Sequence, residues 1–450
     1  MTEGTSELLT IAERVIEQAM PGEQVEAYVS RGSSTEVRAF GGEVESFTSA
    51  TSQGIGIRVI EDHRVGFAHA GSLDPEVIAE TLAEARDNRG FSEPDEWVAL
   101  SKPDGLTPTV HDHWDESVLT TPTQDKVQMA IDLEAAVLAA DPRVTGVRVA
   151  SYSDGTGEMA LATSTGVRAI DSGTGAQMSV AAMAKDGEET QIAGGWDVDR
   201  GPQGLSLDKV RDDAVHRVTR LLGASQPKSE KLTIVLEPRM ASSIIGIMVG
   251  MLSGERLLKG RTPFLDRVGE LIASPLLSVT DDATDARSFS ATSVDGEGQT
   301  CRPLSLVDEG VLKAFMHNTY TGRRSGEGTT ANGKRGYRSS PGVGAHAIVM
   351  APGEGDLDSI IASVDNGLLV TSMSGLHSGV NAISGDFSVG AEGLMIRNGE
   401  LAEPIREATI ASTLQKMLTD IVSVGADTEW QPSGAGPVSI AISDVAMSGA

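Results

Sequence analysis

The chain has 450 residues, of which 39% are hydrophobic and 4% aromatic, and its formal net charge is −28 at pH 7. This length predicts two or three domains, because single cores stop growing at about 250–300 residues. The acidic balance argues against nucleic-acid binding, which needs Lys and Arg to neutralise phosphates. No apolar run is long enough to cross a bilayer, and Cys301 is the only cysteine, which excludes an intrachain disulfide. We therefore expect a soluble cytoplasmic protein without nucleic-acid or membrane partners.

The first hundred residues predict a helix, antiparallel strands and a second helix. Apolar residues on one face predict a helix over residues 8–19, and acidic residues where a signal peptide would be basic argue against an export signal. A hairpin is predicted over residues 54–71, turning near residues 61–63. Asp74-Pro75 then predicts a helix start. We expect an α+β region at residues 1–100.

The next region repeats this layout. A Pro-, Asp- and Ser-rich connector covers residues 88–121, and helices are predicted at 124–140 and 208–222. Ser153-Asp154-Gly155 reads as a turn between short strands. The predicted strands lie at residues 147–151, 158–162, 166–170 and 177–184. We expect a second α+β region at 101–228, possibly a duplicate of the first.

From residue 229 to residue 450 the pattern is mainly β. Residues 232–236, four apolar side chains and Thr233, predict a buried strand, followed by a helix candidate at 238–258. Turn-rich, strand-like segments lead to a helix predicted at 409–422 and a last strand at 438–442. The whole chain therefore predicts an α+β fold whose C-terminal domain is mainly β with one buried helix.

Three segments of this last region resemble the TldD/PmbA family, in its PmbA/TldE branch. They are PLLSVTDDAT, SVDGEGQTCRPLSLVDEGVLKAFMHNTYTGRR and GVNAISGDFSVGAEG. The family was once described as a modulator of DNA gyrase. The resemblance implies a cytoplasmic protein that assembles with a zinc-bearing TldD-type subunit into a metallopeptidase complex. Such a complex admits unfolded polypeptides and trims precursor peptides.

The resemblance also implies where zinc would bind. In the TldD branch the corresponding helix carries His-Glu-x-x-x-His, and a cysteine near the C-terminus is the third ligand. An ungapped match puts Gly246 and Met251 at the histidines and Ile247 at the glutamate, and the tail 428–444 has no cysteine. None of these three residues can take over zinc binding or proton transfer, since glycine and isoleucine have no suitable group and a thioether is a poor zinc donor. We expect no metal and no catalytic residue in this chain and zinc in the partner, and Gly246 and Gly250 would permit close packing by a neighbour.

Candidates for a substrate cleft come from these segments and from a basic loop. Residues 322–344 carry five cations in an acidic chain. This loop is either a mobile element at the cleft or an ordinary solvated loop. Residues 295–298 predict an acidic turn, with acid–base work by paired carboxylates as the alternative. The candidate cleft residues are Glu297, Arg302, Arg323, Arg324, Asn381 and Asp386.

The histidines give no strong candidate for a metal or catalytic site. His111 and His113 could share one face of a strand, but they lie in the connector, so we expect an exposed loop there. His377 lies within a family-like segment, where we expect a loop histidine.

The predicted function is that of a zinc-less subunit that completes the substrate cleft while its partner hydrolyses peptides. One alternative is a stand-alone, non-enzymatic homodimer that binds peptides or a regulatory partner. Another is a hydrolase with a new site around Asp295, Glu297 and Asp386. The sequence leaves open the peptide substrates and any direct contact with gyrase.

Overall fold

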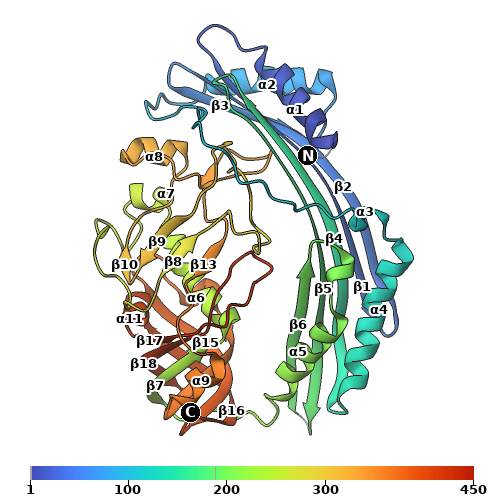
Figure 1. The fold of residues 1–450 in the computed structure, drawn as a ribbon, viewed down its shortest axis with the longest axis vertical. Helices are drawn as coiled ribbons and strands as arrows, with labels where there is room; N and C mark the ends of the chain where they lie inside the picture. The colour runs from blue at the N-terminus through green and yellow to red at the C-terminus, as the bar shows by residue number, and fades with distance from the viewer. Residues whose placement is uncertain (1–2, 188, 450) are drawn as a thin grey trace.

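The computed structural model describes residues 3–187 and 189–449. Its N-terminal half is built on one curved antiparallel sheet with strand order β3-β2-β1-β4-β5-β6 (Figure 1). The strands are β1 (Gln24–Phe40), β2 (Glu43–Glu61), β3 (Arg64–Ala70), β4 (Val144–Thr163), β5 (Arg168–Asp186) and β6 (Glu189–Asp199). Because β1 pairs with β4, the first two predicted regions share this sheet.

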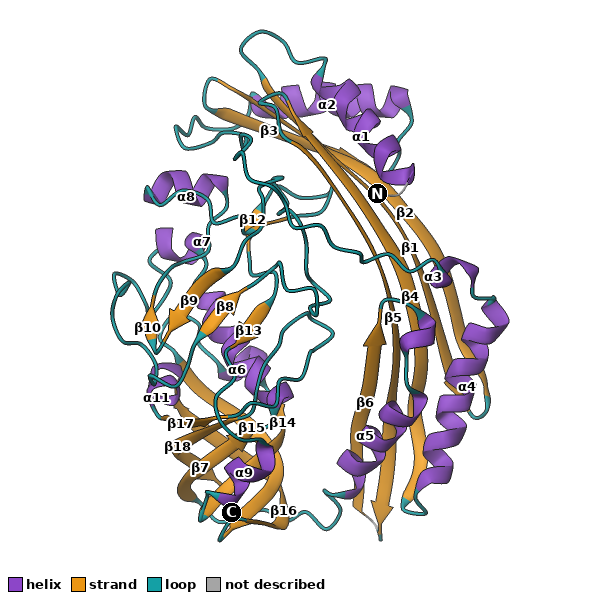
Figure 2. Ribbon diagram, in the orientation of Figure 1, coloured by secondary structure: helices purple, strands orange, loops and turns teal. Residues whose placement is uncertain are grey.

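Four longer helices pack on one face of this sheet. The helices of this half are α1 (Glu3–Ile16), α2 (Pro75–Arg89), α3 (Ser117–Thr120), α4 (Thr123–Ala140) and α5 (Leu207–Thr219), with a 3₁₀ turn at Pro202–Gly204. Val25 and Val29 of β1 pack with α1 and α2, whereas Val37 packs with α4 and α5. These odd-numbered residues share one face of the strand. The opposite, concave face is left for the C-terminal domain (Figure 2).

The order of helix, three strands and helix therefore occurs twice, and the hairpin turn at Asp62 and His63 is confirmed, with φ of 50° and 62°. The turn predicted at Ser153-Asp154-Gly155 is wrong, as are the short strands around it. Gly155 lies inside β4, opposite Ser34 on one side and Gly175 on the other. A Cβ on Gly155 would lie 2.6 Å from the Ser33 carbonyl oxygen. This glycine marks a close approach of two backbones, not a turn.

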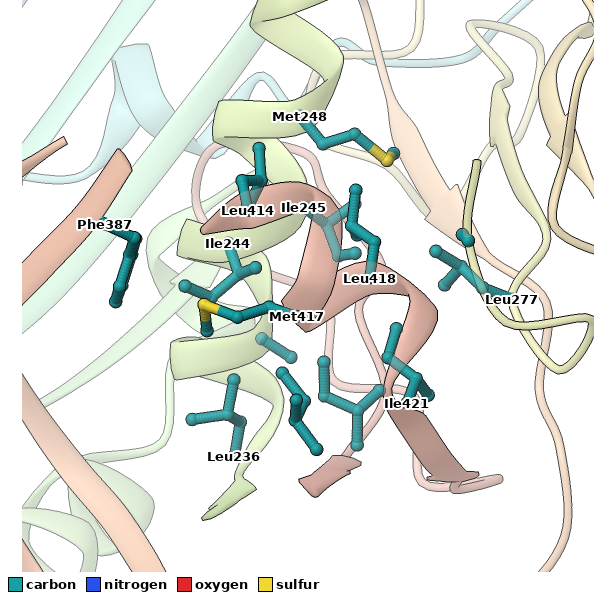
Figure 3. Packing of buried hydrophobic residues seen from close by; sticks show 14 of the residues in the cluster. Leu236, Ile244, Ile245, Met248, Leu277, Phe387, Leu414, Met417, Leu418 and Ile421 are labelled. Carbon is teal, nitrogen blue, oxygen red and sulfur yellow. The ribbon is translucent and has the colours of Figure 1, made fainter. Parts of the chain in front are cut away.

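The C-terminal domain is centred on a second six-stranded sheet with order β16-β15-β14-β7-β18-β17, in which β16 also pairs with β18 and closes a barrel. Its strands are β7 (Glu230–Leu236), β14 (Asn366–Ser374), β15 (Asp386–Arg397), β16 (Glu400–Thr413), β17 (Ile421–Val424) and β18 (Ile440–Ser448). Helices α6 (Pro238–Met251) and α11 (Leu414–Thr419) pack on one side of it, as Figure 3 shows for Ile244, Met248 and Leu418. Helix α9 (Leu357–Ala362) packs on the other.

Shorter elements connect this barrel to the N-terminal sheet. A four-stranded sheet has the order β10-β9-β8-β13 and a two-stranded one joins β11 to β12. The elements are α7 (Gly254–Leu258), β8 (Val279–Asp281), β9 (Leu304–Asp308), β10 (Val311–Leu312), α8 (Thr319–Ser325), β11 (Gly333–Lys334), β12 (Gly342–Val343), β13 (Ile348–Met350) and α10 (Leu376–Gly379).

The α+β class with a mainly β C-terminal domain is confirmed. The helix predicted at 409–422 is wrong in extent, because residues up to Thr413 continue β16 and only Leu414–Thr419 is helical. Strand pairing with β15 and β18 there outweighs the helical spacing of the apolar residues. Among the described residues, no helix combines the length and the apolar character needed to span a membrane.

Candidate functional site

Helix α6 presents the positions of the family's zinc motif in two different environments. Gly246 and Gly250 are on an open face, since a Cβ built on either would meet no atom within 4 Å. Met251 is fully buried in the barrel core, and Ile247 packs against the edge of that core. Among the described residues no neighbour fills the space that the two glycines leave, so the packing they would permit is not used within this chain. The helix is apolar toward the barrel, and the two glycines lie on its other side.

These residues do not fit a zinc ion. Gly246 has no donor atom, and the sulfur of Met251 lies in a core of apolar side chains. In the part of the chain that the structure describes, no three His, Cys, Asp or Glu side chains come close enough to hold a metal. Residues 428–444, where the family's cysteine would lie, have none. Metal-dependent hydrolysis therefore has no support in the residues of α6.

The segment from Asp295 to Gly298 forms a tight turn whose carboxylates are buried. Asp295 accepts hydrogen bonds from the backbone N–H groups of Glu297, Gln299 and Gly333 at 2.8–2.9 Å. Gly298 has a φ of +73°, which favours glycine. Burial, with the charge of Glu297, raises the pKa of Asp295 to about 7. The carboxylate of Asp295 thus holds the turn together.

Glu297 belongs to a buried ion network between the two halves of the chain. Arg58 of β2 donates to both carboxylate oxygens of Glu26 at 3.0 and 2.8 Å, and its Nη2 lies 3.7 Å from Glu297 Oε1. Arg335 also pairs with Glu26, and its guanidinium lies 5.0 Å from the ring centroid of Tyr28. Burial raises the pKa of Glu26, but the two arginines outweigh burial and hold it below its usual value. This network docks the C-terminal domain on the sheet.

The basic segment 322–344 is not simply a solvated loop. It includes the end of α8 and the paired strands β11 and β12, and the side chain of Arg335 has no exposed surface. Arg323 and Arg324 are exposed on α8. Arg324 donates to the Tyr320 hydroxyl at 2.8 Å, and Arg323 donates to the Glu96 carbonyl at 3.3 Å. Arg335 is therefore a buried structural cation, whereas Arg323 and Arg324 are surface cations.

The prediction of an exposed loop at His111 and His113 is wrong. Their rings stack with centroids 4.7 Å apart, and His113 is only 7% exposed. Burial lowers the pKa of both, that of His113 to about 4. The connector is held between β5 and the C-terminal domain, for example where Thr174 N donates to His113 O at 2.8 Å. Proline and acidic residues gave no sign of this burial.

A hollow of about 440 Å³ opens beside His113 on the concave face of the N-terminal sheet. Arg200 and Phe289 form one wall, and the guanidinium lies 4.9 Å from the Phe289 ring centroid. Arg200 Nη2 also donates to the Ser288 carbonyl at 3.0 Å. Asp171 and Glu158 add carboxylates to this wall. The result is a polar cleft between the two halves of the chain.

The remaining candidate residues line neither the polar cleft beside His113 nor the ion network around Glu297. Asn381 accepts from Ile383 N at 2.9 Å, and Asp386 accepts from the Ser384 hydroxyl at 2.6 Å, so both stabilise one exposed turn before β15. Arg302 donates to the Thr329 carbonyl at 3.1 Å. His377 is exposed on α10. Asp295 and Glu297 are buried whereas Asp386 is exposed, and no hydrogen bond or ion pair between described residues joins Asp386 to either of them.

Comparison with known families gives matches along most of the chain. Residues 25–89 match domain 1 of the PmbA/TldA metallopeptidases, residues 116–222 match the central domain, and residues 229–449 match the C-terminal domain.

Individual relatives agree with these matches. The chain is 26% identical over 406 residues to the metalloprotease PmbA of Escherichia coli O157:H7, covering 90% of this chain and 88% of that protein. It is 24% identical over 395 residues to a metalloprotease TldD homolog of Buchnera aphidicola, covering 83% and 79%. The structure of TldE from Thermococcus kodakarensis superposes with a TM-score of 0.88 at 24% identity, covering 99% of each chain. The chain belongs to the PmbA/TldD metallopeptidase family.

Proposed function

We propose that this chain is the zinc-less subunit of a cytoplasmic TldD/TldE-type metallopeptidase complex. It completes the cleft that holds unfolded polypeptides or precursor peptides, and a TldD-like partner supplies zinc and performs hydrolysis. The observation that carries the proposal is the chemistry of α6. Gly246, Ile247 and Met251 offer no zinc ligand and no base, while the glycine face of the same helix stays open. Membership of a metallopeptidase family supports a role in peptide chemistry.

The polar cleft beside His113 supports the substrate-holding role. It lies between the concave sheet and the C-terminal domain, and its walls carry both charge signs and hydrogen-bonding groups. An extended peptide can bind such a surface largely through its backbone, which tolerates many sequences. The chain therefore contributes binding surface without a reactive centre of its own.

The test is to purify the chain alone and together with a TldD-type subunit from the same genome. Zinc content is measured by mass spectrometry of the native proteins, and cleavage is followed on an unfolded polypeptide. We expect the chain alone to contain no zinc and to cleave nothing, and the complex to contain zinc and to lose activity with a chelator. Stoichiometric zinc in the isolated chain, or cleavage that chelators do not affect, would contradict the proposal.

The alternative, a stand-alone homodimer that binds peptides without hydrolysis, makes a different prediction. It expects the chain to remain with its own copies when the TldD-type subunit is present in excess. Size-exclusion chromatography with light scattering on the mixture separates the two functions, because the subunit proposal expects the mixed species.

A further inference from the structure

A second cavity, distinct from the polar cleft, lies where the end of the N-terminal sheet meets α7 and α8. Its volume is about 390 Å³, within the range of small-ligand pockets. Much of its wall is apolar, formed by Ile60 and Val65 of the sheet, Val98 of the connector, Leu258 of α7 and Pro341. This wall can cover one aliphatic side chain but is too small to hold a folded segment.

Arg58 lies in the wall of this cavity as a buried cation. The residue is 8% exposed, and Glu26 takes hydrogen bonds from its Nε and Nη2. Its other terminal nitrogen, Nη1, makes no hydrogen bond with the described residues, and the Glu297 carboxylate lies 3.7 Å from Nη2 of the same guanidinium. The bidentate contact with Glu26 fixes the guanidinium plane, so this nitrogen is a pre-positioned donor.

The rim of the cavity adds two more cations. Within the described residues, the side chain of Arg324 donates through Nη1 to the Tyr320 hydroxyl, and the ammonium group of Lys259 pairs with Glu255 at 4.0 Å. Among the lining residues three side chains are therefore cationic and one, Glu255, is a carboxylate, while the oxygens of Asn318, Tyr320, Thr321 and Ser340 are uncharged. A ligand group that only accepts hydrogen bonds and is negatively charged suits this arrangement.

We propose that this cavity binds a carboxylate that carries a short aliphatic side chain, as found at the C-terminus of a peptide. The carboxylate contacts Arg58 Nη1 and Arg324, and the aliphatic group packs against Ile60, Val65 and Leu258. The site is formed entirely by this chain. Binding therefore does not depend on a partner subunit, on zinc or on the function proposed above.

The experiment is isothermal titration calorimetry on the isolated full-length chain at low ionic strength. The probes are N-acetyl-leucine, N-acetyl-leucinamide and an N-acetylated peptide of four alanines ending in a free leucine. We expect N-acetyl-leucine to bind with a Kd on the order of 1 mM. We expect the amide to bind at least about tenfold more weakly, because it loses the charge-assisted hydrogen bonds. The peptide should bind no more weakly than N-acetyl-leucine.

The variants locate the site. Arg324→Ala and Lys259→Ala should each weaken N-acetyl-leucine, the first by about tenfold. Arg323→Ala is the matched control, because it removes the same charge from the same helix but does not line the cavity. All three positions are exposed, and an unchanged melting temperature shows that each variant folds. Equal binding of acid and amide, no binding of the acid, weaker binding of the peptide, or an equal loss in Arg323→Ala would each overturn the proposal.

Discussion

Arg335 offers a direct test of how the two halves of the chain are held together. Its side chain and that of Glu26 are both fully buried, although the two residues are 309 positions apart in the sequence. We expect Arg335→Met to destabilise the protein, because the buried carboxylates of Glu26 and Glu297 would then share the cation Arg58. Breaking a buried ion pair costs about 3–5 kcal/mol. Since Glu26 keeps its bidentate contact with Arg58, we take the lower end, about 3 kcal/mol.

The assay is equilibrium urea unfolding at pH 7, read in the first transition because a chain of this size need not unfold in one step. The matched control is Arg338→Ala, which removes an exposed arginine from the same segment and should change stability by less than about 0.5 kcal/mol.

A double-mutant cycle identifies the contact. In the Glu26→Gln background the arginine has lost its carboxylate, so Arg335→Met should cost at least about 1 kcal/mol less than in the native sequence. Additive effects, or a stability of Arg335→Met within error of the native protein, would refute the account of this network as the link between the domains.

Three further predictions concern stability. Because burial lowers the pKa of His113 to about 4, the unfolded chain takes up this proton near pH 6.5 but the folded chain only near 4. The free energy of unfolding should therefore fall by about 2 kcal/mol between pH 7 and pH 4.5. In His113→Asn this loss of about 2 kcal/mol should be absent, which is measured by urea titrations of both proteins at both pH values. Gly66→Ala should destabilise by at least about 1 kcal/mol, since its Cβ would lie 1.9 Å from the Ala85 carbonyl oxygen; a neutral effect in thermal melts would contradict the packing of α2 on β3. Gly246→Ala should stabilise the isolated chain by about 1 kcal/mol, since helix propensity rises and its Cβ meets nothing; an unchanged or lower melting temperature would show that this face is not open.

Local patterns predicted the parts of the fold that local physics determines. The mostly apolar segment 232–236 is part of β7, which packs against α6 on one side and α9 on the other. Asn-Gly is a dipeptide typical of two-residue hairpins, and Asn398-Gly399 forms the turn between β15 and β16 with φ of 52° and 79°. Both features depend on neighbouring residues alone, which is why the sequence contains enough information to place them.

The contacts between the halves could not be predicted in this way. Arg335 stands among glycines and serines and reads as a surface residue, yet it is buried because Glu26 and Tyr28 meet it from the far end of the chain. His113 was assigned to a loop because proline and aspartate surround it. Its burial comes from β5 and the segment around Phe289, which no pattern near His113 encodes. The turn at Gly155 was predicted wrongly for the same reason, since this glycine lets the distant strand β1 approach β4 closely.

Gly246 and Gly250 on the open face of α6 lower the stability of this helix and bear on the proposed function. Two glycines inside a helix destabilise it by about 1 kcal/mol each relative to alanine. Within this chain neither glycine gains a contact in return, because no atom lies near the space that a side chain would occupy. Packing in the isolated chain therefore does not explain them. In the proposed complex, two glycines on one helix face let the partner or an extended peptide approach the backbone closely at those positions. If so, Gly246→Leu should leave the isolated chain folded but weaken its assembly with the TldD-type subunit or its peptide binding. Native assembly and binding in this variant would leave the two glycines without a functional role.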